Sequence, residues 1–317
     1  MKNKKDKDKL EYRLKYEIAE ELGLIDKIEE VGWGGLTAKE SGKIGGLVRI
    51  RKKEIEKSKV IEGRHWGGKN VNLRKIRKAS ELIKNSDKTM VLTGAGISTE
   101  SGIPDFRSPG TGLWENTDPM EVLSTTVLYN EPERFYKEGF NILLDMMDAS
   151  PNKGHNILAE MESLGFIDGI ITQNIDNLHH KAGSDYILEV HGNTREGSCM
   201  NCGHTVDINI LTEKVNNNEI PPKCDNCGGI LRPDVILFGD MLPDAFNIAF
   251  REVENSDLLI AIGSSLMVAP VNYLPQIANK LIIINKGYTV MDSFAEVKIE
   301  GGAGDVLEAI LDELERK

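Results

Sequence analysis

The sequence lacks any apolar run that approaches the roughly 18 to 20 residues a membrane-spanning helix needs. Its lysine-rich N-terminus also lacks the apolar segment of a secretory signal peptide. Aromatic residues make up only 6% of the 317 residues, but a hydrophobic content of 40% is enough for one sizeable core and a smaller module. We therefore expect a cytoplasmic protein without a membrane partner.

Cysteine is scarce as well, and its arrangement argues against a disulfide framework. The four cysteines form two Cys-x2-Cys pairs, Cys199 with Cys202 and Cys224 with Cys227, and 21 residues separate the pairs. Four thiolates at this spacing can close a tetrahedron around Zn²⁺, which leaves no position open for a substrate. The pattern predicts a structural zinc site, with paired disulfides or a redox dithiol as alternatives.

Basic residues are sparse after the first quarter of the chain. Residues 1–80 contain 22 Lys and Arg against 13 Asp and Glu, whereas residues 81–317 contain 17 against 37. A basic segment with a net charge of +9 thus precedes an acidic body with a net charge of −20. This asymmetry indicates that the two parts meet different partners.

The basic segment has the pattern of a helical hairpin. Apolar residues recur at helical spacing over residues 10–24, and a glycine-rich turn follows at 31–36. Thr37 and Glu40 form a capping-box pattern for a second helix, which contains two adjacent glycines at 45 and 46. Glycines weaken a lone helix, so close approach of another helix or of a nucleic-acid backbone would explain them.

Three stretches of this segment resemble the small acid-soluble spore proteins of the α/β type. They are residues 15–23 (KYEIAEELG), 32–35 (GWGG) and 42–46 (GKIGG). The resemblance implies a two-helix domain over residues 1–55 that binds double-stranded DNA through residues 10–55 in the forespore or spore core of a bacterium. It also implies cleavage by a germination protease between Glu17 and Ile18. The alternative is a basic hairpin that serves solubility or self-association.

After a linker over residues 56–70, a buried strand leads into a glycine turn. Residues 91–93 (VLT) run directly into Gly94, Ala95 and Gly96, an order typical of strand-to-phosphate turns. Thr99 takes the place of the third glycine of the usual dinucleotide fingerprint, so an ordinary glycine turn is an alternative. Residues 102–107 (GIPDFR) then place an acid, an aromatic ring and a guanidinium side by side.

Polar groups follow several further predicted strands. The strand 166–172 ends at residues 173–176 (QNID), 186–190 at His191, 258–262 at residues 263–265 (GSS), and 281–284 at Asn285. Because ligands of open α/β sheets lie beyond the carboxyl ends of the strands, Asn174 and Asp176 are expected to face the same cleft as Asp105. Residues 263–265 are candidates to hydrogen-bond phosphates, and Asn285 is a candidate for a ribose hydroxyl. His191 is a candidate general base, since the ordinary pKa of histidine lies near neutrality. A polar surface loop and a merely packed histidine are the alternatives.

The remaining pattern predicts helices and one more apolar segment. Helices are expected over residues 71–83, 119–147, 154–164 and 305–314. Residues 231–240 are expected to return to the main fold as an apolar segment that ends in a turn.

These motifs resemble the sirtuins, in the order GAGIS (94–98), GIPDFR (102–107), TQNID (172–176), HG (191–192), the four cysteines, FG (238–239) and GSS (263–265). The resemblance covers residues 71–317. It implies an α/β fold, a Rossmann-like parallel sheet domain with a smaller zinc-binding module inserted at about residues 195–232. It also implies an NAD-dependent protein-lysine deacetylase or deacylase that uses NAD and Zn²⁺ and holds an acyl-lysine peptide between its two parts.

The resemblance assigns roles to individual residues. His191 and Asn174 would be catalytic, and the four cysteines would bind zinc. The peptide would be bound by Val235, Phe238, Gly239, Leu266 and Val268. NAD would be bound by Gly94, Ala95, Gly96, Ile103, Asp105, Phe106, Arg107, Gln173, Asn174, Ile175, Asp176, Gly263, Ser264, Ser265 and Asn285.

In the implied reaction, the acyl oxygen attacks the ribose C1′ as nicotinamide leaves, and His191 deprotonates a ribose hydroxyl. The products would be free lysine and O-acyl-ADP-ribose. Asp240 stands where the family usually has Glu, and Ser264 where Thr is common, but both keep the chemistry of the group. Tyr136 is followed three residues later by Gly139 instead of the arginine that binds a succinyl carboxylate, so short, uncharged acyl groups are expected.

Two other functions remain open at this point. The chain could be chiefly a DNA-binding spore component with a secondary enzyme activity. It could also be an NAD-dependent protein ADP-ribosyltransferase, because that reaction breaks the same bond. The segments 235–239 and 264–268, which resemble a peptide channel, favour the deacylase.

Overall fold

The computed structural model describes residues 14–16, 18–19, 22–25, 27–28, 33–37, 39–49, 51, 68–105, 121–144 and 146–316. The chain divides into two compact units, Met1–Val71 and Asn72–Lys317. Residues 52–67, which include most of the predicted linker, lie outside the described part. The predicted domain boundaries at residues 55 and 71 therefore stay a prediction.

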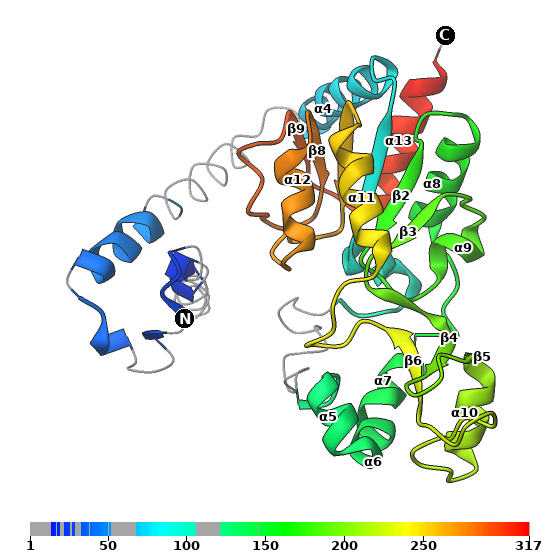
Figure 1. The fold of residues 1–317 in the computed structure, drawn as a ribbon. Coiled ribbons are helices and arrows are strands. Elements are labelled where there is room, and N and C mark those ends of the chain that lie inside the picture. The colour runs from blue at the N-terminus through cyan, green and yellow to red at the C-terminus, as the bar shows by residue number, and fades with distance from the viewer. Residues whose placement is uncertain are drawn as a thin grey trace, which may run out of the picture. The chain divides into compact units, whose positions relative to one another are not determined.

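A six-stranded parallel sheet forms the centre of the second unit, which confirms the predicted α/β fold (Figure 1). Every residue of its four central strands is buried, so these strands appear in the sequence as continuous apolar runs. The chain order changes direction between β1 and β7, where an open sheet forms a ligand crevice. The strand order is β3 (Ile187–Glu189), β2 (Gly169–Thr172), β1 (Thr89–Thr93), β7 (Leu258–Ile262), β8 (Leu281–Ile284) and β9 (Val297–Ile299).

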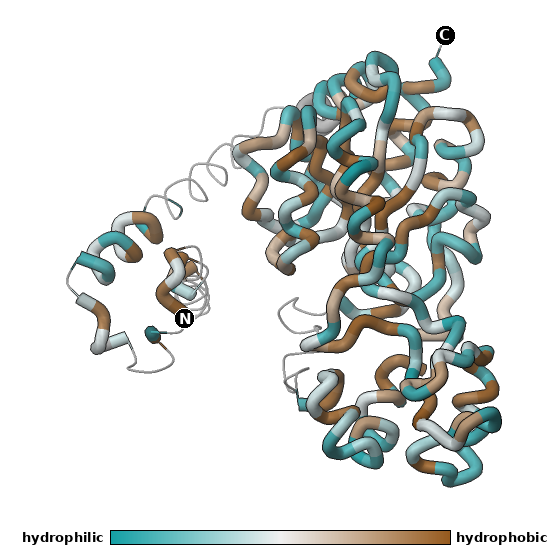
Figure 2. The backbone as a smooth tube through the Cα atoms, viewed as in Figure 1, coloured by the Kyte–Doolittle hydropathy of each residue, from teal (hydrophilic) through white to brown (hydrophobic). Residues whose placement is uncertain are grey.

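Helices cover both faces of this sheet (Figure 1). Val91 and Ile260 face a core formed with α4 (Gly68–Lys84), α8 (Lys153–Ser163) and α13 (Ala303–Glu315). Met90 and Leu92 face a second core formed with α11 (Asp244–Glu254) and α12 (Leu274–Ile277). Successive residues of a strand point to opposite faces, so each central strand supplies both cores, and Figure 2 shows the resulting hydrophobic centre.

A smaller antiparallel sheet has the order β5 (Thr205–Asp207), β4 (Gly192–Cys199) and β6 (Leu231–Val235). The expectation that residues 231–240 return to the main fold is wrong for this strand, because β6 pairs with β4. Leu231, Pro233 and Val235 are buried, whereas Arg232 and Asp234 between them are only half-buried. This alternation is that of a strand with one covered face, not of a strand in the middle of a parallel sheet.

The helical segment predicted over residues 119–147 is divided into several short elements. Pro132 begins α6, and because proline has no N–H to donate, α5 ends before it. Phe135, Tyr136 and Phe140 pack into one core with α10 (Ile208–Asn216) and the small sheet. The short elements are η2 (Ala95–Ser101), α5 (Thr125–Asn130), α6 (Pro132–Arg134), the π-helical η5 (Phe135–Gly139), α7 (Phe140–Leu144), α9 (Leu178–Ala182) and η6 (Val271–Tyr273).

The N-terminal unit has a small core of its own. Residues 39–49 form a helix, and η1 (Trp33–Gly35) precedes it. The predicted capping box is present, because the Thr37 N–H donates to Glu40 Oε2 at 2.7 Å and the Glu40 N–H donates to Thr37 Oγ1 at 3.3 Å. The buried residues of this core are Leu14, Ile18, Ala19, Ile28, Ile44 and Val48. Across the described ranges of both units, every helix is too short or too polar to traverse a lipid bilayer.

Candidate functional site

The turns that follow β1 and β7 meet at the switch point of the sheet. The Gly94 N–H donates to Ile262 O at 3.0 Å, and the Gly96 N–H donates to Gly263 O at 2.7 Å. A Cβ on Gly96 would lie 2.6 Å from Gly263 O, and one on Gly263, whose φ is +63°, would lie 2.4 Å from Ile97 N. Both glycines are therefore required for the two backbones to touch, in addition to the room that they leave for a phosphate.

Ser98 of η2 connects this turn with the residues after β2. Its hydroxyl donates to Asp176 Oδ2 at 2.6 Å, and it accepts from Asn174 Nδ2 at 3.0 Å. Asn174 Nδ2 also donates to Gly94 O at 3.3 Å, so the orientation of this amide is fixed. Sequence reasoning did not include Ser98 among the site residues, although it belongs to the GAGIS motif.

Asn174 keeps one polar atom unused. Its side chain is 6% exposed, and Oδ1 is buried without a hydrogen-bond partner in the described part of the chain. Asp176 is 4% exposed, and its Oδ1 accepts from Leu178 N at 3.0 Å. A buried acceptor without a partner is costly, so this position is suited to a ligand that brings an N–H or O–H group.

Two buried histidines lie behind this amide and were missed by sequence reasoning. His155 Nε2 is 3.4 Å from Ser98 Oγ, and His179 Nε2 is 2.9 Å from Thr93 Oγ1. Burial lowers the pKa of His155 to about 4 and that of His179 to about 3, so both rings are neutral near pH 7. Their neighbours in the sequence are mostly polar, so nothing there indicates that either ring is buried beside the site.

His191 follows β3 and lies beside the same loop. Its Nδ1 is 2.9 Å from Gln173 O, and a carbonyl oxygen only accepts, so Nδ1 carries the proton of the neutral ring. Nε2 therefore holds a lone pair. Burial lowers the pKa of His191 below its ordinary value, and the hydrogen bond to Gln173 partly offsets this. The ring is thus neutral near pH 7 and able to accept a proton, as a general base must be.

The remaining predicted NAD-binding residues differ in how deeply they are buried. Ile103 is buried against Met146 and Leu178, and Asp105 is half-buried. Phe106 and Arg107 lie outside the described residues. Ile175 packs at the edge of the same small cluster, and Ala95 and Ser265 are half-buried in their turns.

Two further predicted contacts follow β7 and β8. Ser264 Oγ accepts from Gln173 Nε2 at 3.0 Å and from Leu266 N at 3.2 Å, which ties the turn after β7 to the loop after β2. Asn285 Nδ2 donates to Gly287 O at 3.1 Å, and this side chain is half-buried.

The segment predicted to bind peptide is held by backbone contacts. The Phe238 N–H donates to Leu123 O at 3.0 Å, and Thr125 N donates to Phe238 O at 2.9 Å. Gly239 has a φ of +95°, which suits glycine. Side chains at Phe238 and Val268 are exposed, whereas those of Val235 and Leu266 are buried in the two cores.

The Arg232 guanidinium stabilises the same segment. It pairs with Asp240 through Nη1 at 3.1 Å and Nη2 at 2.6 Å, and Nη2 also donates to Val235 O at 2.9 Å. Asp240 Oδ2 additionally accepts from Leu237 N at 2.8 Å. The aspartate at this position thus keeps both of its oxygens in use.

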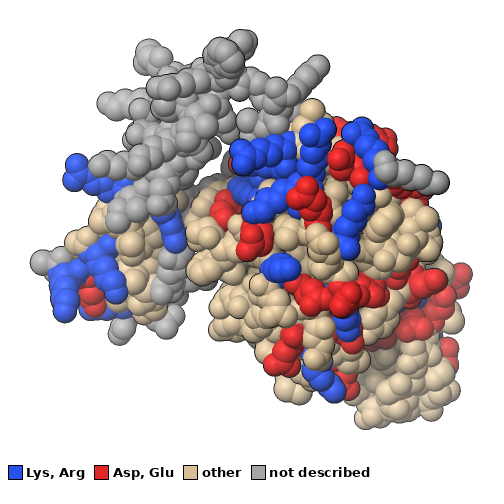
Figure 3. Space-filling view, turned by 90° about the horizontal axis from the view of Figure 1, so that it is seen from above, with Lys and Arg blue, Asp and Glu red and all other residues tan. Residues whose placement is uncertain are grey.

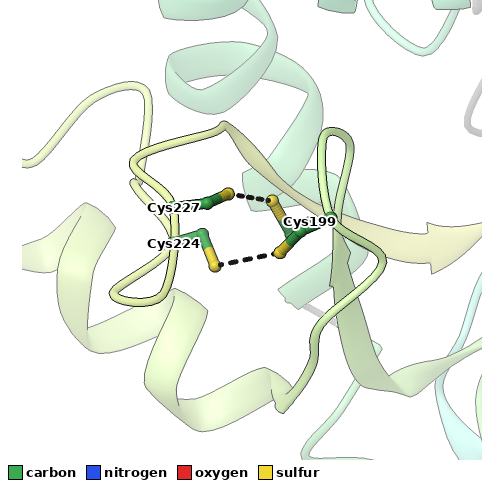
Figure 4. A group of neighbouring side chains, drawn as sticks. Cys199, Cys224 and Cys227 are labelled. Carbon is green, nitrogen blue, oxygen red and sulfur yellow. Dashed lines mark hydrogen bonds between the residues drawn. The ribbon is translucent and has the colours of Figure 1, made fainter.

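The four cysteines fit a structural zinc ion. Their sulfur atoms all lie within 4.8 Å of one another, with Cys199 and Cys227 at 3.4 Å and Cys202 and Cys224 at 3.8 Å (Figure 4). Tetrahedral Zn–S bonds of about 2.3 Å require sulfur atoms roughly 3.8 Å apart. A Cβ on Gly229 would lie 2.9 Å from Cys199 Sγ, so glycine keeps the centre open for the metal. All four cysteines are free thiols, which disfavours the disulfide alternative.

A Rossmann-like parallel sheet with touching glycine turns at its switch point and an inserted four-cysteine module defines an α/β enzyme of the dinucleotide-binding class. A model of the Sir2 family matches residues 94–270. The chain belongs to this family, and the resemblance to the sirtuins is confirmed. NAD is the cofactor of this family.

Individual relatives agree with this membership. The chain is similar to "NAD-dependent protein deacetylase 2" of Caldanaerobacter subterraneus subsp. tengcongensis, with 65% identity over 235 residues, 74% of this chain and 94% of the relative. It is 42% identical over 247 residues to "NAD-dependent protein deacylase 2" of Archaeoglobus fulgidus, covering 76% of this chain and 96% of that protein. A solved structure described as "Sir2-p53 peptide-NAD+" matches with a TM-score of 0.69 and 36% identity over 75% of this chain and 98% of that one.

The N-terminal resemblance is also found by comparison. A model of small, acid-soluble spore proteins of the alpha/beta type matches residues 3–55. This match ends before the Sir2 match begins, so the two resemblances fall on separate parts of the chain.

Proposed function

We propose that this chain is an NAD-dependent protein-lysine deacylase that releases nicotinamide and O-acyl-ADP-ribose. The observation that carries the proposal is His191, whose Nδ1–H is held by Gln173 O while Nε2 keeps its lone pair. The names of the relatives, which are deacetylases and a deacylase, favour deacylation over ADP-ribosyl transfer to protein.

The residues after β1 and β2 fit the predicted NAD site. The unused Asn174 Oδ1 is an acceptor for the nicotinamide carboxamide, with Asp176 and Ile103 beside it. When bound, NAD supplies an ADP-ribosyl group that takes over the acyl group as the bond to nicotinamide breaks. Because Asn174 and Asp176 are nearly fully buried, they exclude water from the end of the site where nicotinamide leaves.

His191 moves the proton in this proposal. Nε2 accepts the proton of a ribose hydroxyl, and the imidazolium that forms keeps its Nδ1–H bonded to Gln173 O. That carbonyl stabilises the charged ring, since a hydrogen bond to the charged form raises its pKa. The His191 ring is thus neutral before it accepts the proton, and the hydrogen bond to Gln173 O stabilises its charged form afterwards.

The peptide side of the proposal rests on two exposed segments. Phe238 and Val268 present apolar side chains to solvent, and the backbone of residues 235–239 is fixed by Leu123, Thr125 and Arg232. A fixed backbone segment with exposed apolar side chains can bind an extended peptide that carries the acyl-lysine.

Short, uncharged acyl groups are the proposed substrates. The Tyr136 hydroxyl is buried and bonded to Leu231 O, and a Cβ on Gly139 would lie 2.4 Å from Val122 O. No side chain fits at position 139, so the carboxylate of a succinyl group finds no cation there.

Deacylation is tested with the full zinc-loaded chain, NAD and matched acetyl-lysine and succinyl-lysine peptides. Mass spectrometry should show loss of the acetyl group and release of nicotinamide, both dependent on NAD and both lost in His191→Ala. His204→Ala, at an exposed histidine, is the matched control and should keep the activity. Unchanged peptide with labelled ADP-ribose on protein would reverse the assignment, and faster turnover of succinyl-lysine would overturn the acyl preference.

We also propose that the N-terminal unit binds double-stranded DNA, as its spore-protein match suggests. Lys39, Lys43 and Arg49 are exposed and lie on one helix face by their spacing, and Gly42 and Gly46 lie on the same face. Neither glycine has a described atom within 4 Å of a Cβ position, so the packing of the unit does not explain them. On the face seen in Figure 3, the described surface of this unit shows more Lys and Arg than Asp and Glu.

The proposed role is to bring the deacylase to DNA-associated proteins of a sporulating bacterium, with binding driven by phosphate contacts. The predicted cleavage between Glu17 and Ile18 falls at Glu17, which lies outside the described residues. A gel shift should show salt-sensitive binding by the full chain and none by residues 71–317. Equal affinity of the two would remove the DNA role.

A further inference from the structure

Two loops that carry predicted site residues are joined by three successive contacts. His191 Nδ1 donates to Gln173 O at 2.9 Å, and Thr194 Oγ1 donates to Ile175 O at 2.7 Å. The third contact is from the Arg195 guanidinium, whose Nη1 donates to Asn177 Oδ1 at 2.7 Å. Alternate residues of the loop after β2 are therefore bound by His191 and by Thr194 and Arg195 of β4.

Arg195 is itself anchored on the other side of His191. Nη1 and Nη2 reach the two carboxylate oxygens of Glu189, each at 2.6 Å, in a bidentate pair. Glu189 is the last residue of β3, and its side chain is 13% exposed. Because Glu189 and Arg195 flank His191, their pairing closes the turn that carries the base. A bidentate pair of this kind fixes the orientation of the Arg195 guanidinium as well as its distance from the Glu189 carboxylate.

Asn177 gives an independent indication that the contact is built. It has a φ of +64° and occupies the N-cap of α9, where an asparagine side chain would ordinarily accept from its own helix. Here it makes no such capping bond. Its Oδ1 accepts from Arg195 instead, while Asp176 Oδ1 accepts from Leu178 N at the start of α9.

We propose that Arg195 is a positioning residue for His191, an inference that rests on the proposed function of His191 as the base. The Nδ1–H bond to Gln173 O requires the two loops to keep their spacing, and Arg195 is the side chain that spans from Glu189 to the far end of the loop at Asn177. Without Arg195, the remaining side-chain contact of Glu189 within the described residues is a weak one, to His180 Nε2 at 3.5 Å. The imidazole then loses the fixed partner that sets which nitrogen carries the proton.

The test uses the full zinc-loaded chain with Arg195→Met and Asn177→Gly, and Arg195→Lys as the conservative variant. Glycine preserves the left-handed backbone at 177 while removing the acceptor. Arg134→Met is the matched control, because the Arg134 side chain is similarly exposed and also makes ion pairs, with Glu131 and Glu138. The readouts are the kcat and KM for an acetyl-lysine peptide and NAD, and the ¹⁵N–¹H ring spectrum of His191 in histidine-labelled protein.

Arg195→Met and Asn177→Gly should each lower kcat by about tenfold, with both KM values changed less than about threefold, since the base is misplaced but the binding groups are not. Arg195→Lys should recover part of kcat. The ring spectrum should shift from the Nδ1–H tautomer to a mixture in Arg195→Met, and it reports on the inference even if the wild-type chain proves inactive. An unaltered tautomer in both variants, or an equal loss in Arg134→Met, would overturn it.

Discussion

The Ser98 hydroxyl donates to Asp176 Oδ2 at 2.6 Å and thereby joins η2 to the loop after β2. Ser98 Oγ in turn accepts from Asn174 Nδ2, so one buried hydroxyl orients both the Asp176 carboxylate and the Asn174 amide of the proposed nicotinamide site. A serine has one hydrogen to donate and two lone pairs, and this environment uses both capacities.

Ser98→Ala should weaken both the fold and NAD binding. The change leaves Asp176 Oδ2 and part of Asn174 Nδ2 unsatisfied, at a cost of about 1 to 3 kcal/mol. We expect KM for NAD to rise about tenfold or more, as measured by steady-state kinetics. Ser163→Ala is the control, because Ser163 donates only to Glu160 O at an exposed helix end. A KM equal to that of the wild type would refute the orienting role.

The pH dependence of kcat/KM should report the lowered pKa of His191. Because burial lowers the pKa of His191 and the neutral ring is the base, kcat/KM should fall only when the pH drops below about 6.5, the ordinary pKa of histidine. His191→Ala should lose a factor of about 10² to 10⁴ in kcat and should lack this acid limb. An acid limb with a midpoint above pH 7 would contradict the assignment of the base.

The fold should lose stability in mild acid through His155 and His179. Both pKa values are lowered in the folded state, so between pH 6.5 and about 4 the unfolded chain binds protons that the native chain does not. Stability is therefore complete above pH 6.5 and declines as the pH falls, by up to about 1.4 kcal/mol per pH unit for each ring. Urea unfolding at pH 7 and pH 5 measures this.

Two variants test whether the buried histidines cause this loss of folding stability in acid. His155→Gln should flatten the pH dependence relative to the wild type, whereas His204→Gln, at an exposed position, should leave its slope unchanged. If both variants give the wild-type slope, other groups cause the acid lability.

Zinc removal should unfold the small module before the parallel sheet. Cys199 and Cys224 are buried in the same core as Phe135, Tyr136 and Leu211, so four unligated thiols would leave this core without its central link. A chelator or Cys224→Ser should lower the melting temperature and abolish peptide deacylation. Metal analysis should give one zinc per chain in the wild type. A chelated chain with unchanged melting would exclude a structural metal.

The sequence was most informative where residues are uniformly buried or bear a fixed motif. The strand 258–262 was predicted to the residue, because five consecutive apolar residues end at a glycine. The four cysteines also came together as predicted. In contrast, residues 231–240 were expected in the main fold as one apolar segment, whereas Leu231–Val235 alternates buried and half-buried residues and pairs with β4 in the small sheet.

The sequence indicated the polar residues of the candidate site, but not the residues that hydrogen-bond to them and hold them in place. Asn174, Asp176 and His191 follow strands, and strand ends are visible in a sequence. Ser98 and His155 contact each other although they lie 57 residues apart in the sequence. Arg195 contacts Asn177 across the loop after β2 and the strand β3, whose relative positions a local sequence pattern does not specify. Such contacts depend on the three-dimensional register, which local patterns do not contain.

The backbone contact between Gly96 and Gly263 also limits how this protein can change over evolutionary time. Two side chains in contact can be exchanged jointly, one becoming smaller as the other grows. Here neither position has a side chain, and a methyl group at either one meets main-chain atoms of the other turn at 2.6 Å or less. A change in a neighbouring side chain cannot relieve this main-chain clash, so both positions are restricted to glycine.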